Sequence, residues 1–443
     1  MDSFHHSPRG QLLCEGIPAA DLAERFGTPS YIYSRQTLED HYDKIARAFA
    51  DLKPLICYSI KSCSNIHICR VLAARGSGMD VVSGGELERA VLAGTSASKV
   101  VYAGVGKTDA EIAAALKAGI GYFNIESEPE FEIIAATARR VGVRSHAALR
   151  INPDIDPHTH AYTSTGKKES KFGVDIQRAV AFFERFGRDE CLKLDALHLH
   201  IGSPVYSTEP YVGAIRKALD LMDELARRGY AVSTLDVGGG FGADYETDKS
   251  PLATDYAAAI VPLLRDRVKK GLKIILEPGR SISANAGLLL TRVLFVKDGW
   301  GTTSEGKAVP KKFVICDAGM NTLLRPSLYG AFHFIWPVQV AENFNPPRRG
   351  DIRMPGLELC DVVGPICESG DFLAKDRMLP PVKRGDLLAV FAAGAYGMSM
   401  ASTYNSQPLP AEVLVEGDGA RVIRARQTMG ELLADELRSE PRL

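Results

Sequence analysis

The sequence has 443 residues, 45% hydrophobic and 24% charged, which is typical of a soluble globular protein of two or three domains. Its 53 basic and 54 acidic residues give a net charge of −1, which argues against bulk electrostatic binding to nucleic acid or to an anionic membrane. No stretch offers the roughly 20 mostly apolar residues of a membrane span, and no signal peptide is apparent. The eight cysteines form no C-x-x-C pair, so reduced thiols and a cytoplasmic location are expected.

The N-terminal segment contains SYIYS at 30–34, which predicts a strand, and a helix is expected from Thr37. This strand is expected to pair with the C-terminal part of the chain. The C-terminal domain would then be discontinuous in sequence.

Eight short apolar runs follow, separated by helical patterns that mostly end in glycine. The runs are 54–61, 78–83, 100–105, 122–126, 144–153, 194–203, 235–242 and 273–280, and the first five begin 24, 22, 22 and 22 residues apart. Repeated strand–helix units build parallel sheets, and eight of them close a (β/α)8 barrel. We therefore predict a cofactor-binding barrel over 35–284, with an open doubly wound sheet as the alternative.

After residue 285 the helical patterns give way to short strand-like segments with turn signals. These segments are 291–299, 311–319, 339–344, 358–365 and 411–426. They predict an all-β domain, a β-barrel or sandwich, composed of residues 1–34 plus 285–443.

Residues at the ends of the apolar runs can carry chemistry, because a barrel places its active site where the strands end. The first run ends in Lys61, either a Schiff-base lysine or a side chain that reaches solvent. The sixth ends with His198 and His200. A flat ring such as that of His200 suits stacking on a planar cofactor. We interpret His198 as a structural histidine, since no third metal ligand follows at a convincing spacing.

The last two runs end in groups that suit a phosphate and a cation. The glycines of GGGFG at 238–242 allow backbone N–H groups to approach an anion, although a tight turn is the simpler alternative. Phosphates often bind after the seventh and eighth strands of a barrel, which favours the first interpretation. Glu277 ends the eighth run, and a buried carboxylate there needs a cationic partner such as a pyridinium nitrogen. Lysine, glycines, histidine ring and carboxylate together predict pyridoxal phosphate.

Longer motifs along the chain point in the same direction. They are YSIKS at 58–62, MDVVSGGEL at 79–87, SKFGV at 170–174, HLHIGS at 198–203, VGGGFG at 237–242, EPGR at 277–280, AGMNTLLRPSLYGAFH at 318–333, CESGDFLAKDR at 367–377 and GAYGMSMASTYNS at 394–406. In these motifs the chain resembles the diaminopimelate decarboxylases, within the alanine-racemase-like fold of pyridoxal-phosphate enzymes that includes ornithine decarboxylases. The likeness covers essentially the whole chain. The family more often has alanine where this chain has Ser62.

The resemblance implies a role for each matching residue. Lys61 would hold the cofactor, His200 would stack on its ring, and Glu277 would contact its ring nitrogen. The other residues around the cofactor would be Asp80, Ser203, Gly239, Gly240, Gly279, Arg280 and Tyr396, with Arg150 nearby. The substrate would be bound by Arg280, Arg325, Tyr329, Glu368 and Tyr396.

Cys367 would be the proton donor, and in this fold Cys367 and Glu368 reach the active site of the partner subunit in a homodimer. A buried structural thiol is the alternative for Cys367, and its neighbours Glu368 and Asp371 favour the functional interpretation.

The implied reaction converts meso-2,6-diaminopimelate to L-lysine and CO2, the last step of lysine biosynthesis. One alternative is decarboxylation of another basic amino acid or a carboxylated polyamine, of the ornithine, arginine or carboxynorspermidine type. Arg325 suits a second substrate carboxylate, and Glu368 stands where ornithine-type relatives carry aspartate, so both favour diaminopimelate. A non-catalytic regulatory homologue of the same fold is a further alternative, which the intact cofactor and proton-donor residues oppose.

Overall fold

The computed structural model describes residues 2–156, 171–302, 306–342 and 344–439. Two compact units divide the chain. The barrel unit consists of residues 39–243 and 250–282, and the β unit of residues 1–38, 244–249 and 283–443. Among the described residues, no helix combines the length and apolar character needed to cross a bilayer.

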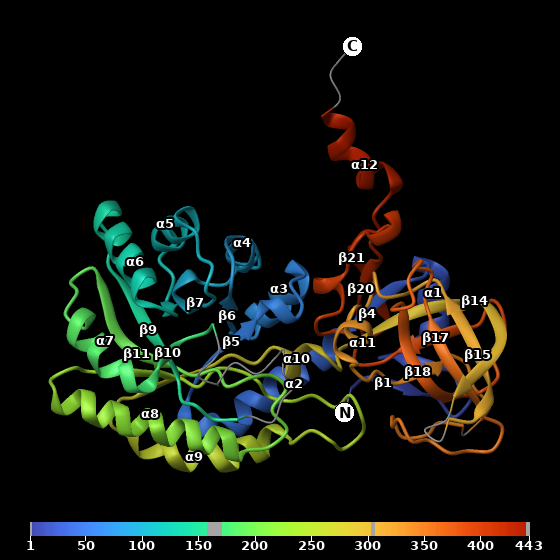
Figure 1. The fold of residues 1–443 in the computed structure, drawn as a ribbon, viewed down its shortest axis with the longest axis horizontal. Coiled ribbons are helices and arrows are strands. Elements are labelled where there is room, and N and C mark those ends of the chain that lie inside the picture. The colour runs from blue at the N-terminus through green and yellow to red at the C-terminus, as the bar shows by residue number, and fades with distance from the viewer. Residues whose placement is uncertain (1, 157–170, 303–305, 343, 440–443) are drawn as a thin grey trace. The chain divides into compact units, whose positions relative to one another are not determined.

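The barrel unit is built on eight parallel strands (Figure 1). They are β5 (Leu55–Ser59), β6 (Gly78–Val81), β7 (Val100–Tyr102), β8 (Tyr122–Ile125), β9 (Ser145–Asn152), β11 (Leu192–His198), β12 (Thr234–Asp236) and β13 (Lys273–Leu276). Each strand pairs with the next, and β13 pairs with β5, so the sheet closes on itself. A two-residue strand, β10 (Val174–Asp175), adds to β9. The predicted (β/α)8 barrel is confirmed, and the open-sheet alternative is wrong.

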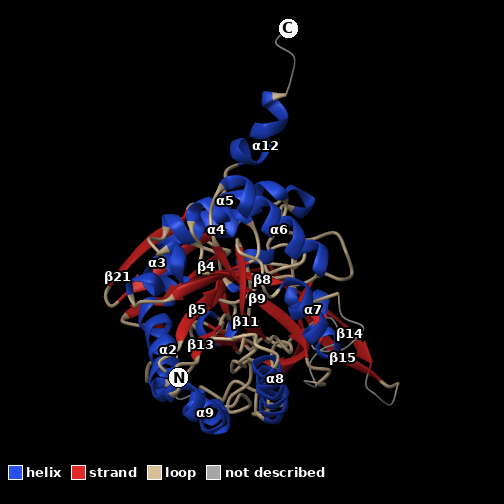
Figure 2. Ribbon diagram, turned by 90° about the vertical axis from the view of Figure 1, so that its left-hand side faces the viewer, coloured by secondary structure: helices blue, strands red, loops and turns tan. Residues whose placement is uncertain are grey.

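Helices surround these strands (Figure 2). They are α2 (Arg35–Ala48), α3 (Ile66–Ala74), α4 (Gly84–Leu92), α5 (Asp109–Ala118), α6 (Glu128–Val141), α7 (Ala179–Phe186), α8 (Glu209–Arg227), α9 (Ala253–Lys269) and α10 (Arg280–Ser283). Gly119 and Gly142 end α5 and α6 in the left-handed conformation, with φ of 69° and 70°. Gly187, after α7, differs: its φ is −66°, so this helix ends without the left-handed turn.

The β unit is mostly sheet and contains the N-terminal strand. A small sheet holds β1 (Phe4–His6), β2 (Leu12–Cys14) and β3 (Ile17–Pro18), and the large sheet runs β18 (Phe372–Leu379), β17 (Glu358–Val363), β15 (Ala308–Cys316), β14 (Gly287–Thr302), β4 (Ser30–Ser34), β20 (Ala411–Glu416), β21 (Gly419–Arg424). Two further strands, β16 (Ile335–Pro337) and β19 (Leu387–Val390), pair with each other, and β19 also pairs with β14. The predicted pairing of 30–34 with C-terminal strands is confirmed, since β4 lies between β14 and β20.

One predicted strand in the β unit is wrong. Residues 339–344, of which Asn343 lies outside the described residues, form no strand, because β16 ends at Pro337 and Gln339 makes only an isolated bridge with Gln11. The unit also has short helices, α1 (Ala19–Phe26), α11 (Arg325–Tyr329) and α12 (Met429–Arg438). Of these, α11 carries residues of the candidate site.

Candidate active site

Lys61 lies just beyond β5, in the single turn Ile60–Ser62, and points to a buried carboxylate. Its Nζ donates to Asp80 Oδ2 at 2.8 Å, and the Ser59 hydroxyl donates to the same oxygen at 2.6 Å. Asp80 sits on β6 beside Ser59, which is its register partner. Burial and the nearby Glu277 charge raise the pKa of Asp80, against the opposing effect of the Lys61 ammonium. The Lys61 amine is therefore oriented by a partner and is still one-third exposed at the end of the strand.

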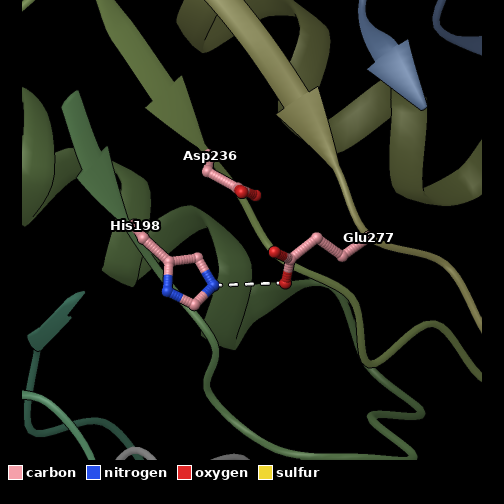
Figure 3. Close-up of side chains that lie close together, drawn as sticks. All are labelled: His198, Asp236 and Glu277. Atoms are coloured by element: carbon pink, nitrogen blue, oxygen red, sulfur yellow. Dashed lines mark hydrogen bonds and ion pairs between the residues drawn. The ribbon is translucent and has the colours of Figure 1, made fainter. Parts of the chain in front are cut away.

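Glu277 follows β13 and is buried among three side chains of neighbouring strands. His198 Nε2 and Glu277 Oε2 are 3.2 Å apart, and Asn124 Nδ2 donates to Oε1 at 3.1 Å. Asp236 also points toward this pair (Figure 3). Although burial alone would raise the pKa of Glu277, the adjacent His198, with Lys61, holds it far below its usual range. Glu277 is thus an anion and can only accept, so His198 Nε2 carries the hydrogen.

His200 is a neutral ring beside the glycine loop. Burial, reinforced by Arg150 and Lys61, lowers the pKa of His200 well below its usual value. The backbone N–H of Gly239 donates to its Nδ1 at 3.4 Å, which also requires that nitrogen to be unprotonated. A neutral flat ring suits stacking against an aromatic cofactor, as the sequence predicted for this residue.

The glycine loop brings backbone segments too close for side chains. A β-carbon on Gly239 would collide with the Glu277 carbonyl oxygen, and one on Gly240 with the Gly202 carbonyl oxygen. Gly240 also has a φ of +94°, in the left-handed region that favours glycine. Next to the glycine loop, after β13, a β-carbon on Gly279 would come within 2.9 Å of Ser59 Cβ. Arg280 Nε donates to the Ser203 hydroxyl at 3.2 Å, which joins the loops that follow β11 and β13.

A buried ion pair links β9 to the segment that follows β8. Arg150, on β9, donates to Glu126 Oε1 at 2.8 Å, and both side chains are buried. The guanidinium carbon also lies 4.7 Å from the centre of the Phe172 ring, in the SKFGV motif, whose Ser170 lies outside the described residues. Burial would raise the pKa of Glu126, but Arg150 and His198 lower it. Arg150 therefore has a carboxylate partner within the protein.

Arg325, at the start of α11 in the β unit, is enclosed by tyrosine rings. Its guanidinium carbon lies 5.3 Å, 5.7 Å and 5.8 Å from the ring centres of Tyr245, Tyr329 and Tyr396. The side chain is buried, yet no carboxylate in the described part of the chain pairs with it, and its Nε has no hydrogen-bond partner there. Tyr396 has a φ of +54°, an uncommon conformation for a non-glycine residue that is frequent at functional sites. This set suits an anionic group of a ligand.

Cys367 and Glu368 lie together on a second loop of the β unit, which leads into β18. Cys367 is exposed, so the buried structural thiol is wrong for it. Its backbone N–H donates to Asn405 Oδ1 at 3.0 Å, and the Tyr404 hydroxyl donates to Glu368 Oε2 at 3.1 Å. The loop thus presents a thiol and a carboxylate to its surroundings, held from the GAYGMSMASTYNS motif.

Asp371 has a structural part in this loop. It is buried and accepts the backbone N–H groups of Met320 and Ile366, each at 2.6 Å. The carboxylate therefore ties the loop to the AGMNTLLRPSLYGAFH motif and shapes it from within.

Comparisons with known proteins agree with this geometry. Residues 35–284 match the family described as pyridoxal-dependent decarboxylase, pyridoxal binding domain. The diaminopimelate decarboxylase of Aquifex aeolicus is 44% identical over 94% of both chains, and that of Pseudomonas aeruginosa is 44% identical over 98% of this chain and 99% of its own. The chain belongs to the diaminopimelate decarboxylase family.

Solved structures support the same family. The diaminopimelate decarboxylase from Helicobacter pylori complexed with L-lysine matches with a TM-score of 0.85 and 39% identity, over 95% of this chain and 100% of that chain. The M. jannaschii enzyme in complex with L-lysine has a TM-score of 0.87 and 35% identity, over 98% of each chain. A lysine/ornithine decarboxylase from Vibrio vulnificus is 22% identical and shares the fold alone. Members of this family are pyridoxal-phosphate-dependent decarboxylases, so the cofactor, the enzyme class and the family resemblance predicted from the sequence are confirmed.

The chemical groups that the barrel residues present in this structure fit pyridoxal phosphate. An amine at the strand end, a buried anion, a neutral flat ring and a backbone cradle without β-carbons are the groups that an aldehyde, a ring nitrogen, an aromatic face and a phosphate require. Glu277 keeps spare lone pairs on both oxygens beyond the two hydrogen bonds it accepts.

Several residues of the site were not predicted from the sequence as functional. In the barrel unit they are Asn124, Asp236 and the pairing of His198 with Glu277; in the β unit they are Tyr245, Tyr404 and Asn405. His198 was interpreted as structural, and its partner turns out to be the candidate cofactor-binding carboxylate. A signal for Asp236 was present, since it interrupts an apolar run just before the glycine loop.

Proposed function

We propose that this protein decarboxylates meso-2,6-diaminopimelate to L-lysine and CO2 as the last step of lysine biosynthesis. The observation that carries the proposal is the near-full-length identity of 44% to diaminopimelate decarboxylases, together with the tyrosine-enclosed Arg325, which has no carboxylate partner among the described residues. A second substrate carboxylate is an anion that would pair with that guanidinium.

In this proposal the barrel, residues 35–284, holds the cofactor. Bound pyridoxal phosphate supplies a sink for the electrons left at the substrate's α-carbon when CO2 departs. Lys61 would hold the cofactor through its amine, which Asp80 orients, and the Glu277 anion would accept a hydrogen bond from the ring nitrogen. The neutral His200 ring would stack on the cofactor ring. The residues assigned to the phosphate are Ser203, Gly239, Gly240, Gly279, Arg280 and Tyr396.

The β domain, residues 1–34 plus 285–443, is proposed to supply substrate and dimer contacts. Arg325 and Tyr329, with Tyr396 and the barrel's Arg280, would bind substrate carboxylate, and Glu368 would pair with the amine at the far end. Cys367 would return a proton to the α-carbon, a task for an accessible acid. Two observations support these assignments: the Cys367 thiol is exposed, and hydrogen bonds from Cys367 to Asn405 and from Tyr404 to Glu368 hold the loop and orient the Glu368 carboxylate.

We further propose a homodimer with shared active sites. Cys367 and Glu368 of one subunit would serve the barrel of the other, so that each site needs both subunits. Two such sites related by a two-fold axis form an isologous interface, the commonest symmetry of soluble oligomers. Support comes from the exposure of the loop that carries them, since residues that act on a partner must be accessible in the single chain.

We place the enzyme in the cytoplasm. The support is the set of eight cysteines, all of which are free thiols in this structure. Thiols persist in reducing compartments, whereas long-lived disulfides mark oxidising ones.

The test is a side-by-side assay of the purified holoenzyme. CO2 release is measured from diaminopimelate, ornithine, arginine and lysine at matched concentrations, with L-lysine quantified as product. Release from diaminopimelate with one lysine formed per CO2 supports the proposal. Preference for any of the other three amino acids contradicts it. Inactivity on all four would favour the alternative of a non-catalytic regulatory homologue.

A further inference from the structure

Two buried residues beside Glu277, His198 and Asp236, have been assigned no contact with the cofactor or the substrate. His198 ends β11 and Asp236 ends β12, and they are direct partners in the register of these parallel strands. Both are 1% exposed, and ligand atoms of His198, Asp236 and Glu277 all lie within 4.8 Å of one another. Figure 3 shows the three side chains pointing toward a common centre.

Two carboxylates this close in a protein interior repel each other, which favours a proton on one of them. Glu277 has two side-chain donors, His198 on one oxygen and Asn124 on the other. Asp236 has no side-chain donor: it accepts the backbone N–H of Gly238 on Oδ1 at 2.8 Å, and a hydrogen bond with Glu277 raises the pKa of Asp236, as expected for a carboxylic acid that donates to a carboxylate. The hydrogen-bond pattern therefore puts the negative charge on Glu277 and the proton on Asp236.

The electrostatics of the barrel interior lead to the same assignment. Burial, with the charge of Glu277 next to it, raises the pKa of Asp236 well above its usual value. The ionisable groups facing the pair are Cys57 on β5, Asp80 on β6, Tyr122 on β8 and His198 on β11, with Lys61 and His200 just beyond β5 and β11. The Lys61 ammonium and the hydrogen bond from His198 favour an ionised Glu277, whereas Asp80 adds negative charge that favours a neutral Asp236.

We propose that Asp236 is a positioning residue that stays a neutral carboxylic acid and, together with His198, keeps Glu277 a fixed anion directed at the cofactor's ring nitrogen. The contact of Glu277 with the ring nitrogen is the one part of this proposal that rests on the proposed function. The same spacing would admit a divalent cation, but His198 Nε2 and Glu277 Oε2 are already at hydrogen-bond distance from each other.

The first test asks where the proton is, and it uses the holoenzyme at neutral pH. Infrared difference spectra of wild type minus Asp236→Asn should show the carbonyl band of a protonated carboxylic acid, which the variant lacks. Asp195→Asn is the matched control, because Asp195 is also a buried aspartate, pairs with His146 and Lys193, and should contribute no such band. Absence of the band from the Asp236 difference, or a stoichiometric divalent metal in the purified protein, overturns the proposal.

The second test asks what His198 does for Glu277, through the affinity for pyridoxal phosphate. His198→Leu removes a charge-assisted hydrogen bond, so the dissociation constant should rise roughly ten- to hundredfold. His198→Gln retains an amide N–H donor and should stay near wild type, and Asp236→Asn should too, since an amide replaces a neutral acid of the same shape. If Gln weakens binding as much as Leu, the donor role is refuted. If the Asp236 band is present but neither His198 variant changes the affinity, the ring-nitrogen contact of Glu277 is wrong, while the proton on Asp236 stands.

Discussion

Replacing Arg325 tests the substrate assignment without disturbing the barrel. Arg325 is buried beneath three tyrosine rings and has no carboxylate partner in the described part of the chain. Arg325→Met keeps a stem of similar length and removes the charge. Loss of ring contacts to the cation is offset by removal of a buried unpaired charge, so the free energy of unfolding should stay within about 1 kcal/mol of wild type.

The catalytic effect of the same substitution should be large. A lost charge-assisted contact of about 1.5–3 kcal/mol corresponds to a roughly ten- to hundredfold fall in kcat/KM for diaminopimelate. Inhibition by the product L-lysine should weaken by a similar factor, because lysine retains the carboxylate that Arg325 would bind. Inhibition by 1,5-diaminopentane, which has no carboxylate, should not change.

Steady-state kinetics and inhibition constants are the assay, and Arg377→Met is the matched control. Arg377 is also a largely enclosed arginine of the β unit whose Nε has no partner among the described residues, and it stacks on Phe332 outside the candidate site. Unchanged kinetics in Arg325→Met, or an equal loss in Arg377→Met, would refute the carboxylate-binding role.

Three further predictions follow from the site. Mixing inactive Lys61→Ala with inactive Cys367→Ala under subunit exchange should restore about a quarter of wild-type activity, since half of the dimers are mixed and each has one intact site; exchange without recovery would contradict shared sites. Glu368→Gln should raise KM for diaminopimelate and leave the affinity for pyridoxal phosphate unchanged, which kinetics and a cofactor titration distinguish. Because the folded pKa of His200 lies below 6.5, the unfolded chain takes up a proton that the folded chain refuses, so unfolding of cofactor-stripped protein should become easier as pH falls below about 6.5. His200→Gln should flatten that pH dependence, by at most about 1.4 kcal/mol per pH unit, and an identical slope in both proteins would refute the neutral ring.

The barrel could be predicted from the sequence because its repeat is a local signal. Apolar runs at near-constant spacing, each followed by an amphipathic helix, specify parallel strands covered on both sides. The same regularity locates the strand ends, where Lys61 and Glu277 lie. What pairs with these residues was harder to predict, because His198 meets Glu277 across strands 79 residues apart, and no local spacing encodes that contact.

The β domain was less predictable because its contacts are long-range. Residues 339–344 read as a strand in the sequence, yet β16 ends at Pro337 and Gln339 makes only an isolated bridge with Gln11. Tyr245, which lies against Arg325, belongs to a short segment between barrel elements that enters the β unit, and nothing in its local sequence marks it. Asp371 could be noticed as a loop carboxylate, but its use as an acceptor for two backbone groups appears only in three dimensions.

The central claim is that the cluster at the strand ends of the barrel holds the cofactor through Lys61. Reduction of the holoenzyme with borohydride, which fixes the cofactor to the amine that carries it, followed by peptide mapping, tests this claim most directly. We predict a single labelled peptide containing Lys61, and no label in Lys61→Ala protein treated in the same way. Label on any other lysine of wild-type protein would contradict the account.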